Sequence, residues 1–504
     1  MLPVLPTSHD QSLHDAPSSR HIESAALSLH PPHTLIERAG LAVARLAVAL
    51  KPFGQNAVVV AGPGNNGGDG LIAARHLAAR GWTIHVLLVG PQPKAGSDAA
   101  HALGAARRAG LHLHADAQQL PRRTDLVIDA LLGLGASRAP EGVFASAIQT
   151  VDLLRGAGAT VLAVDIPSGL DVRTGRALGA DVVRAHHTLT FLTLKTGLFT
   201  GEGRALAGRL WFDDLGVPVD DEGVGLLFGA SRIAHWQDIF ARSASSHKGR
   251  NGDVVVLGGA PTMRGAAWLA ATSALAAGAG RVYAALPDDD GQPWPARPEL
   301  MHWDAARWSA SPNTWRDIIA VCGCGGGTAI ALALSTVLHG ATRVVLDADA
   351  LNLVAADESL QQALRRRAAH GWPTILTPHP LEAARLLGLS SAADVQADRL
   401  DAASQLATRF SATVVLKGSG SVVATPKRRL SINSTGSSAL ATAGTGDVLA
   451  GWIGGLWAQS PGIAPHDLAC TAVAWHGIAA EGHAGPLLAA DLIDAMAARH
   501  SPSA

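Results

Sequence analysis

Aromatic residues are scarce in this chain of 504 residues. It contains a single tyrosine, eight phenylalanines and twelve tryptophans, although 48% of its residues are hydrophobic. The cores must therefore be built mainly from Ala, Leu and Val, a composition that suits helices packed on parallel sheets. A chain of this length is expected to form two or three domains.

Cysteine is also rare, with Cys322, Cys324 and Cys470 as its only instances. Three cysteines cannot form a disulfide framework, which fits a reducing compartment. The Cys322-x-Cys324 spacing matches neither a zinc knuckle nor a redox pair and favours ordinary buried cysteines.

Excess charge and long apolar runs are missing as well. The net charge is -1, so the chain has no basic footprint for nucleic acid or an anionic membrane. The most apolar long stretch, residues 265–280, is too short to span a bilayer and indicates a buried helix. The N-terminus lacks a basic segment followed by an apolar one, as a secretory signal would require. We therefore expect a cytoplasmic protein with small-molecule ligands.

Lysine is the rarest charged residue, because only six of the 40 basic residues are lysines. Lys195, Lys248 and Lys417 nevertheless lie in glycine-containing segments. A compact ammonium group differs chemically from a guanidinium group, so these three are candidates for chemistry.

The first half of the chain alternates between strand-like and helix-like segments. Apolar runs occur at 57–61, 84–89, 126–128, 160–164 and 189–194, with helical patterns such as 71–80 and 144–154 between them. This alternation predicts a doubly wound, mostly parallel sheet that binds ligands at the carboxyl ends of its strands.

A second series begins after an acidic, glycine-rich stretch at 213–225. Its strand-like runs are 253–257, 317–321, 343–346, 374–376 and 413–416, and helical patterns follow at 441–456, 468–480 and 487–498. The proline-rich segment 287–312 is expected to be an irregular surface excursion. We predict two α/β domains, residues 1–227 and 228–504.

The first glycine-rich segment, 62–70, follows an apolar run and contains Asn65, Asn66 and Asp69. Glycine allows backbone N–H groups to approach an anion closely, and a helix N-terminus adds a favourable dipole. The alternative interpretation is a tight turn with an Asp cap. Asp129, Asp165 and Ser168 follow neighbouring strand-like runs, and such hard oxygen donors favour an alkali or alkaline-earth ion over zinc.

Several further segments occur in a characteristic order. They are Arg20-x-x-Glu23, Leu35-Ile36-Glu37-Arg38-Ala39-Gly40, Asn65-Asn66-Gly67-Gly68-Asp69-Gly70, Asp129-Ala130-Leu131-Leu132-Gly133, Asp165-Ile166-Pro167-Ser168-Gly169 and Thr190-Phe191-x-x-x-Lys195-x-Gly197. Over about residues 18–216 the chain resembles the YjeF N-terminal family, the NAD(P)H-hydrate epimerases, with Ile36 in place of the usual Met. The resemblance implies a Rossmann-like, three-layer domain.

The same resemblance implies a set of site residues. Substrate contacts would fall on Asn65, Asn66, Gly67, Gly68, Asp69, Gly133, Leu134, Gly135, Ala136, Ser137, Arg138, Ala139 and Asp165. A potassium ion would be held by Asn66, Asp129 and Ser168. Asp165 is the expected catalytic acid–base group, and Lys195 is the second candidate.

The other glycine-rich segment is Gly444-Thr445-Gly446-Asp447, at the start of a helix-like stretch. A helix N-terminus can steady a transferring phosphoryl group, while a carboxylate one step later accepts a hydroxyl proton. A glycine turn with an Asp N-cap is the alternative interpretation. Asp447 is the predicted catalytic base.

The surrounding segments strengthen the chemical interpretation. They include His247-Lys248-Gly249, Gly265-Ala266-Ala267, Asp347-Ala348-Asp349-Ala350-Leu351-Asn352, Thr377-Pro378-His379-Pro380 and Leu416-Lys417-Gly418-Ser419-Gly420. Over about residues 240–500 the chain resembles the ADP- or ATP-dependent NAD(P)H-hydrate dehydratases, which are ribokinase-like. This resemblance implies substrate contacts on Ala266, Gly325, His379 and Asp447, and nucleotide contacts on Lys417, Gly418, Ser419, Gly420, Ser421 and Gly446.

Two details of this half need separate comment. The run Cys322-Gly323-Cys324-Gly325-Gly326-Gly327 stands where the family usually has Gly-Pro-Gly-Leu-Gly, and losing the proline predicts a looser loop. His379, between two prolines, is expected in an exposed loop role rather than as a helix cap.

Together the two resemblances imply a bifunctional repair enzyme. It would interconvert the R and S forms of hydrated NADH and NADPH, and dehydrate the S form with ADP and Mg2+, giving AMP and phosphate. The alternative is a small-molecule hydroxyl kinase fused to a non-catalytic nucleotide-binding module. A homo-oligomer is expected.

Overall fold

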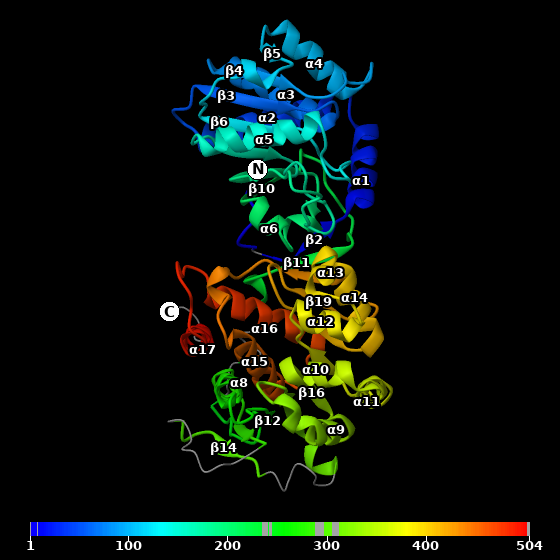
Figure 1. The fold of residues 1–504 in the computed structure, drawn as a ribbon, viewed down its shortest axis with the longest axis vertical. Helices are drawn as coiled ribbons and strands as arrows, with labels where there is room; N and C mark the ends of the chain where they lie inside the picture. The colour runs from blue at the N-terminus through cyan, green and yellow to red at the C-terminus, as the bar shows by residue number, and fades with distance from the viewer. Residues whose placement is uncertain are drawn as a thin grey trace. The chain divides into compact units, whose positions relative to one another are not determined.

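The computed structural model describes residues 2–7, 9–233, 240, 244–287, 297–304 and 312–500. The chain forms two compact units, Met1–Leu5 with Gln11–Gly225, and Pro6–Asp10 with Leu226–Ala504. Each unit is an α/β fold built on a mainly parallel sheet (Figure 1), which confirms the predicted fold class. Much of the predicted excursion at 287–312 lies outside the described residues.

The first unit contains an eight-stranded sheet. Its order is β1 (Leu2–Pro3), β10 (Arg209–Asp213), β8 (His187–Phe191), β7 (Thr160–Val164), β6 (Leu126–Ala130), β3 (Asn56–Ala61), β4 (Thr83–Leu88) and β5 (His112–His114). Only the short β1 runs antiparallel to its neighbour, among the strands that the structure describes. Outside this sheet, β2 (Gln11–His14) and β9 (Leu194–Lys195) pair in parallel.

Helices cover both faces of this sheet. The helices of the unit are α1 (Ala16–Leu29), α2 (Thr34–Leu50), α3 (Asn65–Ala78), α4 (Asp98–Arg108), α5 (Val143–Gly156) and α6 (Gly203–Leu206). Alternate residues of β3 enter two different cores, because Val59 packs with α2, α3 and α4 whereas Val58 and Val60 pack with α5. The unit therefore has the expected three layers.

The second unit has a longer sheet. Its strands follow the order β14 (Met301–His302), β13 (Arg281–Ala285), β12 (Asp253–Leu257), β15 (Ile318–Cys322), β16 (Arg343–Leu346), β17 (Thr374–Leu376), β18 (Thr413–Leu416), β19 (Val422–Ala424), β20 (Leu430–Asn433) and β11 (Gly225–Phe228). The strands from β14 to β18 pair in parallel, and β18, β19 and β20 pair antiparallel.

The helices of this unit also form two layers. The first layer is α8 (Arg264–Ala276), α15 (Thr445–Gln459), α16 (Pro465–Ala479) and α17 (Ala489–Ala497); the second contains α9 (Ala331–Gly340), α10 (Ala348–Ala356), α11 (Glu358–Ala369), α12 (Pro380–Leu387), α13 (Ala392–Ala397) and α14 (Arg399–Phe410) (Figure 1). Trp452, Trp457 and Trp475 are fully buried in the core of the first layer. None of the helices in the described part of the chain combines the length and apolar character that crossing a membrane requires.

Most predicted elements are present, but the start of one helix differs. Helix α3 begins at Asn65 rather than at residue 71, so the glycine-rich segment forms its first turns. Glycine has low helix propensity, which hid these turns from the sequence pattern. The apolar stretch 265–280 contains the expected buried helix, α8.

Candidate active sites

Both units place polar side chains where parallel strands end. In the first unit, Asp129 lies near the end of β6, Asp165 directly follows β7, and Lys195 ends β9. In the second, Cys324, Asp347 and Lys417 follow β15, β16 and β18. The carboxyl edge of a doubly wound sheet is the usual ligand site, and both sets converge there.

Lys195 and Asp165 form a buried ion pair. Lys195 Nζ donates to Asp165 Oδ1 at 2.5 Å and also to the Phe191 carbonyl at 2.7 Å. The lysine side chain is 1% exposed. Asp165 has a φ of 64°, a backbone conformation that is uncommon outside glycine and typical of strained functional positions. Both members of the pair are therefore fixed in position, Lys195 by its hydrogen bonds and Asp165 by its backbone conformation.

A cavity of about 640 Å³ opens beside this pair. Its wall includes the predicted residues Asn65, Asn66, Asp69, Gly133, Leu134, Gly135, Ala136, Ser137, Arg138, Ala139, Asp165 and Lys195. Arg20, Glu23 and Phe144 also line it and were not among the predicted site residues. Arg20 and Glu23 belong to the first motif of the sequence, which was the available signal for them.

Gly67 and Gly68 do not line the cavity among the described residues. Both are buried, and a Cβ on Gly67 would stand 1.9 Å from the Gly62 carbonyl oxygen. A Cβ on Gly68 would stand 2.5 Å from the Cδ1 atom of Ile36. These two glycines therefore serve the close packing of α3 against protein, and the substrate contacts expected of them stay a prediction.

Two acids of the cavity hold their protons more tightly than usual. Burial raises the pKa of Asp69 well above its ordinary value, and the nearby carboxylates of Asp165 and Glu23 raise it further. Burial and Asp165 likewise raise the pKa of Glu23, although a hydrogen bond with Asn65 acts in the opposite direction. Both acids therefore stay protonated to a higher pH than exposed carboxyl groups do.

The predicted cation ligands lie near one another, with Asn66 in the wall of the cavity and both Asn66 and Ser168 bonded to the backbone of Leu132. The hydroxyl of Ser168 donates to Asp129 Oδ1 at 2.6 Å, and its backbone N–H donates to Oδ2 at 2.8 Å. The Asn66 amide donates to the Leu132 carbonyl at 2.9 Å, which leaves Asn66 Oδ1 buried without a hydrogen-bond partner among the described residues. Burial raises the pKa of Asp129 to about 6. A buried acid beside an unpaired amide oxygen fits a bound monovalent cation.

In the second unit, a lysine again pairs with a carboxylate. Lys417 Nζ donates to Asp347 Oδ1 at 2.5 Å, and the Thr377 hydroxyl donates to the same oxygen at 2.8 Å. Burial acts to lower the pKa of Lys417, but the carboxylates of Asp347 and Glu382 outweigh it and raise that pKa overall. Asp347 was quoted in a sequence motif but was not predicted as a site residue.

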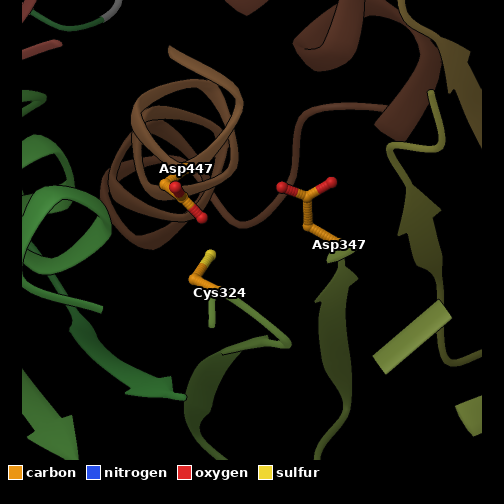
Figure 2. A group of neighbouring side chains, drawn as sticks. All are labelled: Cys324, Asp347 and Asp447. Atoms are coloured by element: carbon orange, nitrogen blue, oxygen red, sulfur yellow. The ribbon is translucent and has the colours of Figure 1, made fainter. Parts of the chain in front are cut away.

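Asp447 lies in the first turn of α15, next to this pair. Cys324, Asp347 and Asp447 extend toward one another from three different segments (Figure 2), and their ligand atoms all lie within 4.8 Å of one another. Burial and the Asp347 carboxylate raise the pKa of Asp447 to about 6. A Cβ on Gly446 would stand 3.3 Å from Lys417 Nζ, so glycine allows α15 to begin close to the lysine.

The glycine loop after β15 is closely packed. The Gly259 N–H donates to the Cys324 carbonyl at 2.9 Å, and the Ala260 N–H donates to the Gly325 carbonyl at 2.7 Å. A Cβ on Gly325 would stand 2.9 Å from that of Ala266, so these two predicted substrate contacts are neighbours. Backbone hydrogen bonds thus hold the loop that lacks the family's proline.

His379 is a helix cap, contrary to the role favoured by the sequence. Its Nδ1 accepts from the backbone N–H groups of Leu381 and Glu382 at 3.1 and 3.3 Å, at the start of α12. Its Nε2 atom lies 3.0 Å from Glu382 Oε1, and its side chain is still 46% exposed. The prolines on either side suggested a loop, whereas Pro380 occupies the first helical position.

The predicted nucleotide loop follows β18. Arg399, which is fully buried, donates to the carbonyls of Leu416 and Lys417 at 3.2 and 3.3 Å. The Ser421 hydroxyl donates to the Gly418 carbonyl at 3.1 Å, and Gly418 and Ser419 are exposed. The start of the loop is therefore fixed by the buried Arg399 side chain, while Gly418 and Ser419 face solvent.

Fold and sites together define a two-domain α/β protein with a carboxylate–lysine centre in each domain. Comparison with known proteins agrees. The family model described as YjeF-related protein N-terminus matches residues 32–197, and the NAD(P)H-hydrate dehydratase model matches residues 254–496.

Relatives cover nearly the whole chain. The bifunctional NAD(P)H-hydrate repair enzyme of Escherichia coli (strain K12) is 37% identical over 455 residues, which are 89% of this chain and 85% of that protein. The enzyme of the same name from Coxiella burnetii is 36% identical, covering 91% of this chain and 93% of that protein. A crystal structure of the ADP/ATP-dependent NAD(P)H-hydrate dehydratase from Bacillus subtilis is 30% identical, with a TM-score of 0.44, covering 52% of this chain and 96% of that one. The chain belongs to the family of bifunctional NAD(P)H-hydrate repair enzymes, as the motifs predicted.

Proposed function

We propose that the first unit epimerises hydrated NADH and NADPH and that the second dehydrates the S epimer with ADP. The corresponding domains would be residues 1–227 and 228–504. The observation that carries the proposal is Asp447, a mostly buried acid with a pKa of about 6 at the N-terminus of α15, beside the Lys417–Asp347 pair. A general base near its operating pH is what this chemistry requires.

In the second unit, Asp447 takes the proton of the C6 hydroxyl as a phosphoryl group is transferred to that oxygen. Backbone N–H groups at the start of α15, including Gly446, hold the transferring phosphate. Loss of phosphate from C6 and of a proton from C5 restores the ring double bond. With ADP as the donor, the other products are AMP and phosphate.

The remaining predicted contacts are assigned by position. Ala266, Gly325 and His379 would touch the hydrate, and Lys417, Gly418, Ser419, Gly420 and Ser421 would touch the nucleotide. The Asp347 carboxylate faces this end of α15, with its Oδ2 atom 3.8 Å from the Cβ position of Gly446, and a hard oxygen donor of this kind fits magnesium. When bound with the nucleotide, that ion supplies charge neutralisation of the phosphates.

In the first unit, Asp165 and Lys195 move protons at C6 of the hydrate. Their 2.5 Å contact and the buried position of the lysine support this assignment. Asn66, Asp129 and Ser168 would hold a potassium ion, since the buried Asn66 Oδ1 has no partner among the described residues. That ion supplies a fixed positive charge near the substrate when bound.

The runner-up is a hydroxyl kinase fused to a binding module. A partner-binding surface would not need Asp129, Ser168 and Lys195 to be nearly or fully buried, as they are. The test supplies the intact chain with hydrated NADPH and ADP, and separately with a vitamin-precursor alcohol and ATP. Recovery of NADPH in the first reaction supports repair. A phosphorylated alcohol without NADPH recovery would establish the kinase instead.

A further inference from the structure

Cys324 has no role in the function proposed above. It lies in the loop after β15, within the stretch that departs from the family pattern, and its side chain is fully buried. Its sulfur atom lies within 4.8 Å of a carboxylate oxygen of Asp447. Cys322, two positions earlier, is also buried but does not belong to this group of ligand atoms. A thiol beside the proposed base is a chemical feature that requires an explanation.

The geometry around Cys324 is close to that of a metal site. Its Sγ atom and one carboxylate oxygen each from Asp347 and Asp447 lie within 4.8 Å of one another (Figure 2). With Zn–S and Zn–O bonds of about 2.3 and 2.0–2.2 Å, donors around a tetrahedral zinc lie roughly 3.3–3.7 Å apart. Asp447 is the most exposed of the three residues. A rotation of its side chain can therefore bring its carboxylate to bonding distance of an ion held by Cys324 and Asp347.

Charge and donor type point in the same direction. Lys417 occupies Asp347 Oδ1, whereas Asp347 Oδ2 lies 3.8 Å from the Cβ position of Gly446, on the side of α15. Two carboxylates and a thiolate, offset by one ammonium, leave two negative charges for a divalent ion to neutralise. Sulfur is a soft donor, so the set selects zinc, cobalt or cadmium over magnesium.

We propose that Cys324, Asp347 and Asp447 bind a thiophilic divalent cation, zinc being the natural probe, and that the bound ion blocks dehydration. Binding exchanges the thiol proton of Cys324 for a metal–sulfur bond and releases that proton to solvent, with no change of oxidation state. A carboxylate bound to a dication is a much weaker base, so Asp447 can no longer take the hydroxyl proton effectively. This second part rests on the proposed function, whereas the binding site does not.

Cobalt titration tests the site itself. The metal-free full chain, with its thiols reduced, is titrated with Co2+ while the near-ultraviolet thiolate-to-cobalt charge-transfer band is recorded. We expect a band that saturates at one equivalent and disappears when zinc is added. Cys322→Ala and Cys470→Ala are matched controls that retain the band, and Cys324→Ala loses it. A band that survives Cys324→Ala, or a folded intact chain without a band, overturns the proposal.

Zinc inhibition tests the consequence. Dehydration of the S epimer is measured with excess magnesium and ADP at rising zinc, each variant being compared with its own zinc-free rate. The inhibition constant should rise at least about 10-fold in Cys324→Ala, since even outer-shell partners of a metal are worth about 10–100-fold. Equal inhibition of the two proteins overturns the proposal. If Asp447→Asn kept full turnover while the unmutated chain still gave the cobalt band, the proposed function would fail and the metal site would stand.

Discussion

The two active centres share an ion pair and differ in what stands beside it. Lys195 meets Asp165 and Lys417 meets Asp347, each at 2.5 Å, in a chain that contains only six lysines. In the second unit, the neighbouring acid Asp447 has no lysine bonded to it and has a pKa of about 6. The lysine fixes one carboxylate, and the adjacent acid remains available to take a proton.

The first unit has the corresponding neighbours in Asp69 and Glu23, whose pKa values are also raised by burial and by Asp165. It adds a feature that the second unit lacks among its described residues, an acid bonded to a serine beside an unpaired amide oxygen. The comparison therefore predicts that the first reaction depends on a monovalent cation and the second does not.

The largest effect is expected from Asp129→Ala. Asp129 is the only negatively charged ligand proposed for the potassium ion. Removing it should abolish ion binding, so conversion of R to S should fall to background. Dehydration of the S epimer should be unchanged. Both rates can be followed by NMR on separately prepared epimers. Loss of both activities would mean that the variant is misfolded, which a thermal melt of the purified chain would detect.

Asp447→Asn should reduce dehydration by roughly 10²–10⁴, the usual range for a general base. The amide keeps the size of the side chain but cannot accept the proton. Nucleotide binding, measured by calorimetry, should survive, and epimerisation should be normal. Asp401→Asn is a matched control, because Asp401 is an exposed acid in the first turn of another helix, α14. Near-normal turnover of the Asp447 variant would mean that the segment 444–447 only caps the helix and that Asp447 is not the base.

The monovalent cation itself can be exchanged. Replacing potassium by lithium or a bulky organic cation should reduce epimerisation, because Asn66 Oδ1 and Asp129 would lose a fitting ion. Dehydration assayed in the same buffers provides the control. Equal responses of the two activities would contradict the difference between the two centres.

A smaller effect concerns pH. Because the base must be ionised, dehydration should decline as pH falls through about 6, the pKa of Asp447. The ammonium of Lys417 acts to lower that pKa. In Lys417→Met the acidic limb of the rate profile should therefore move to higher pH, by about one to three units. A limb that stays in place would show that another group controls the profile.

The smallest effect is expected from separating the units. Residues 1–227 and 228–504 should each fold when expressed alone. The second piece would lack Asp10, which pairs with Arg232 at 2.5 Å, so its melting temperature should be slightly lower than with residues 6–10 restored. Circular dichroism would check this. An unfolded piece would show that the boundary is misplaced.

Much of the fold could be predicted from sequence, because apolar runs and glycine turns are local. Strands β7, β12 and β16 have the predicted limits. The start of α3 was missed since its glycines are chosen for packing against Gly62 and Ile36, which only the tertiary structure brings close.

The sites follow the same rule. Motifs identified Asp165, Lys195, Lys417 and Asp447, but not which residue pairs with which. The Lys417–Asp347 contact joins residues far apart in sequence. Cys324 is buried, as expected, but its proximity to Asp347 and Asp447 arises only when the loop after β15 lies beside α15. Burial and neighbouring charge, which set the pKa values, arise only on folding.

The most direct test is an NMR time course on a mixture of hydrate epimers, with and without ADP, using the intact chain. Without ADP, the two epimers should approach a constant ratio and no NADPH should form. With ADP and magnesium, both epimers should disappear completely, with NADPH and AMP as products. A contradictory result would be rapid loss of the S epimer while the R epimer disappeared only as fast as it does without enzyme. The first unit would then not be an epimerase.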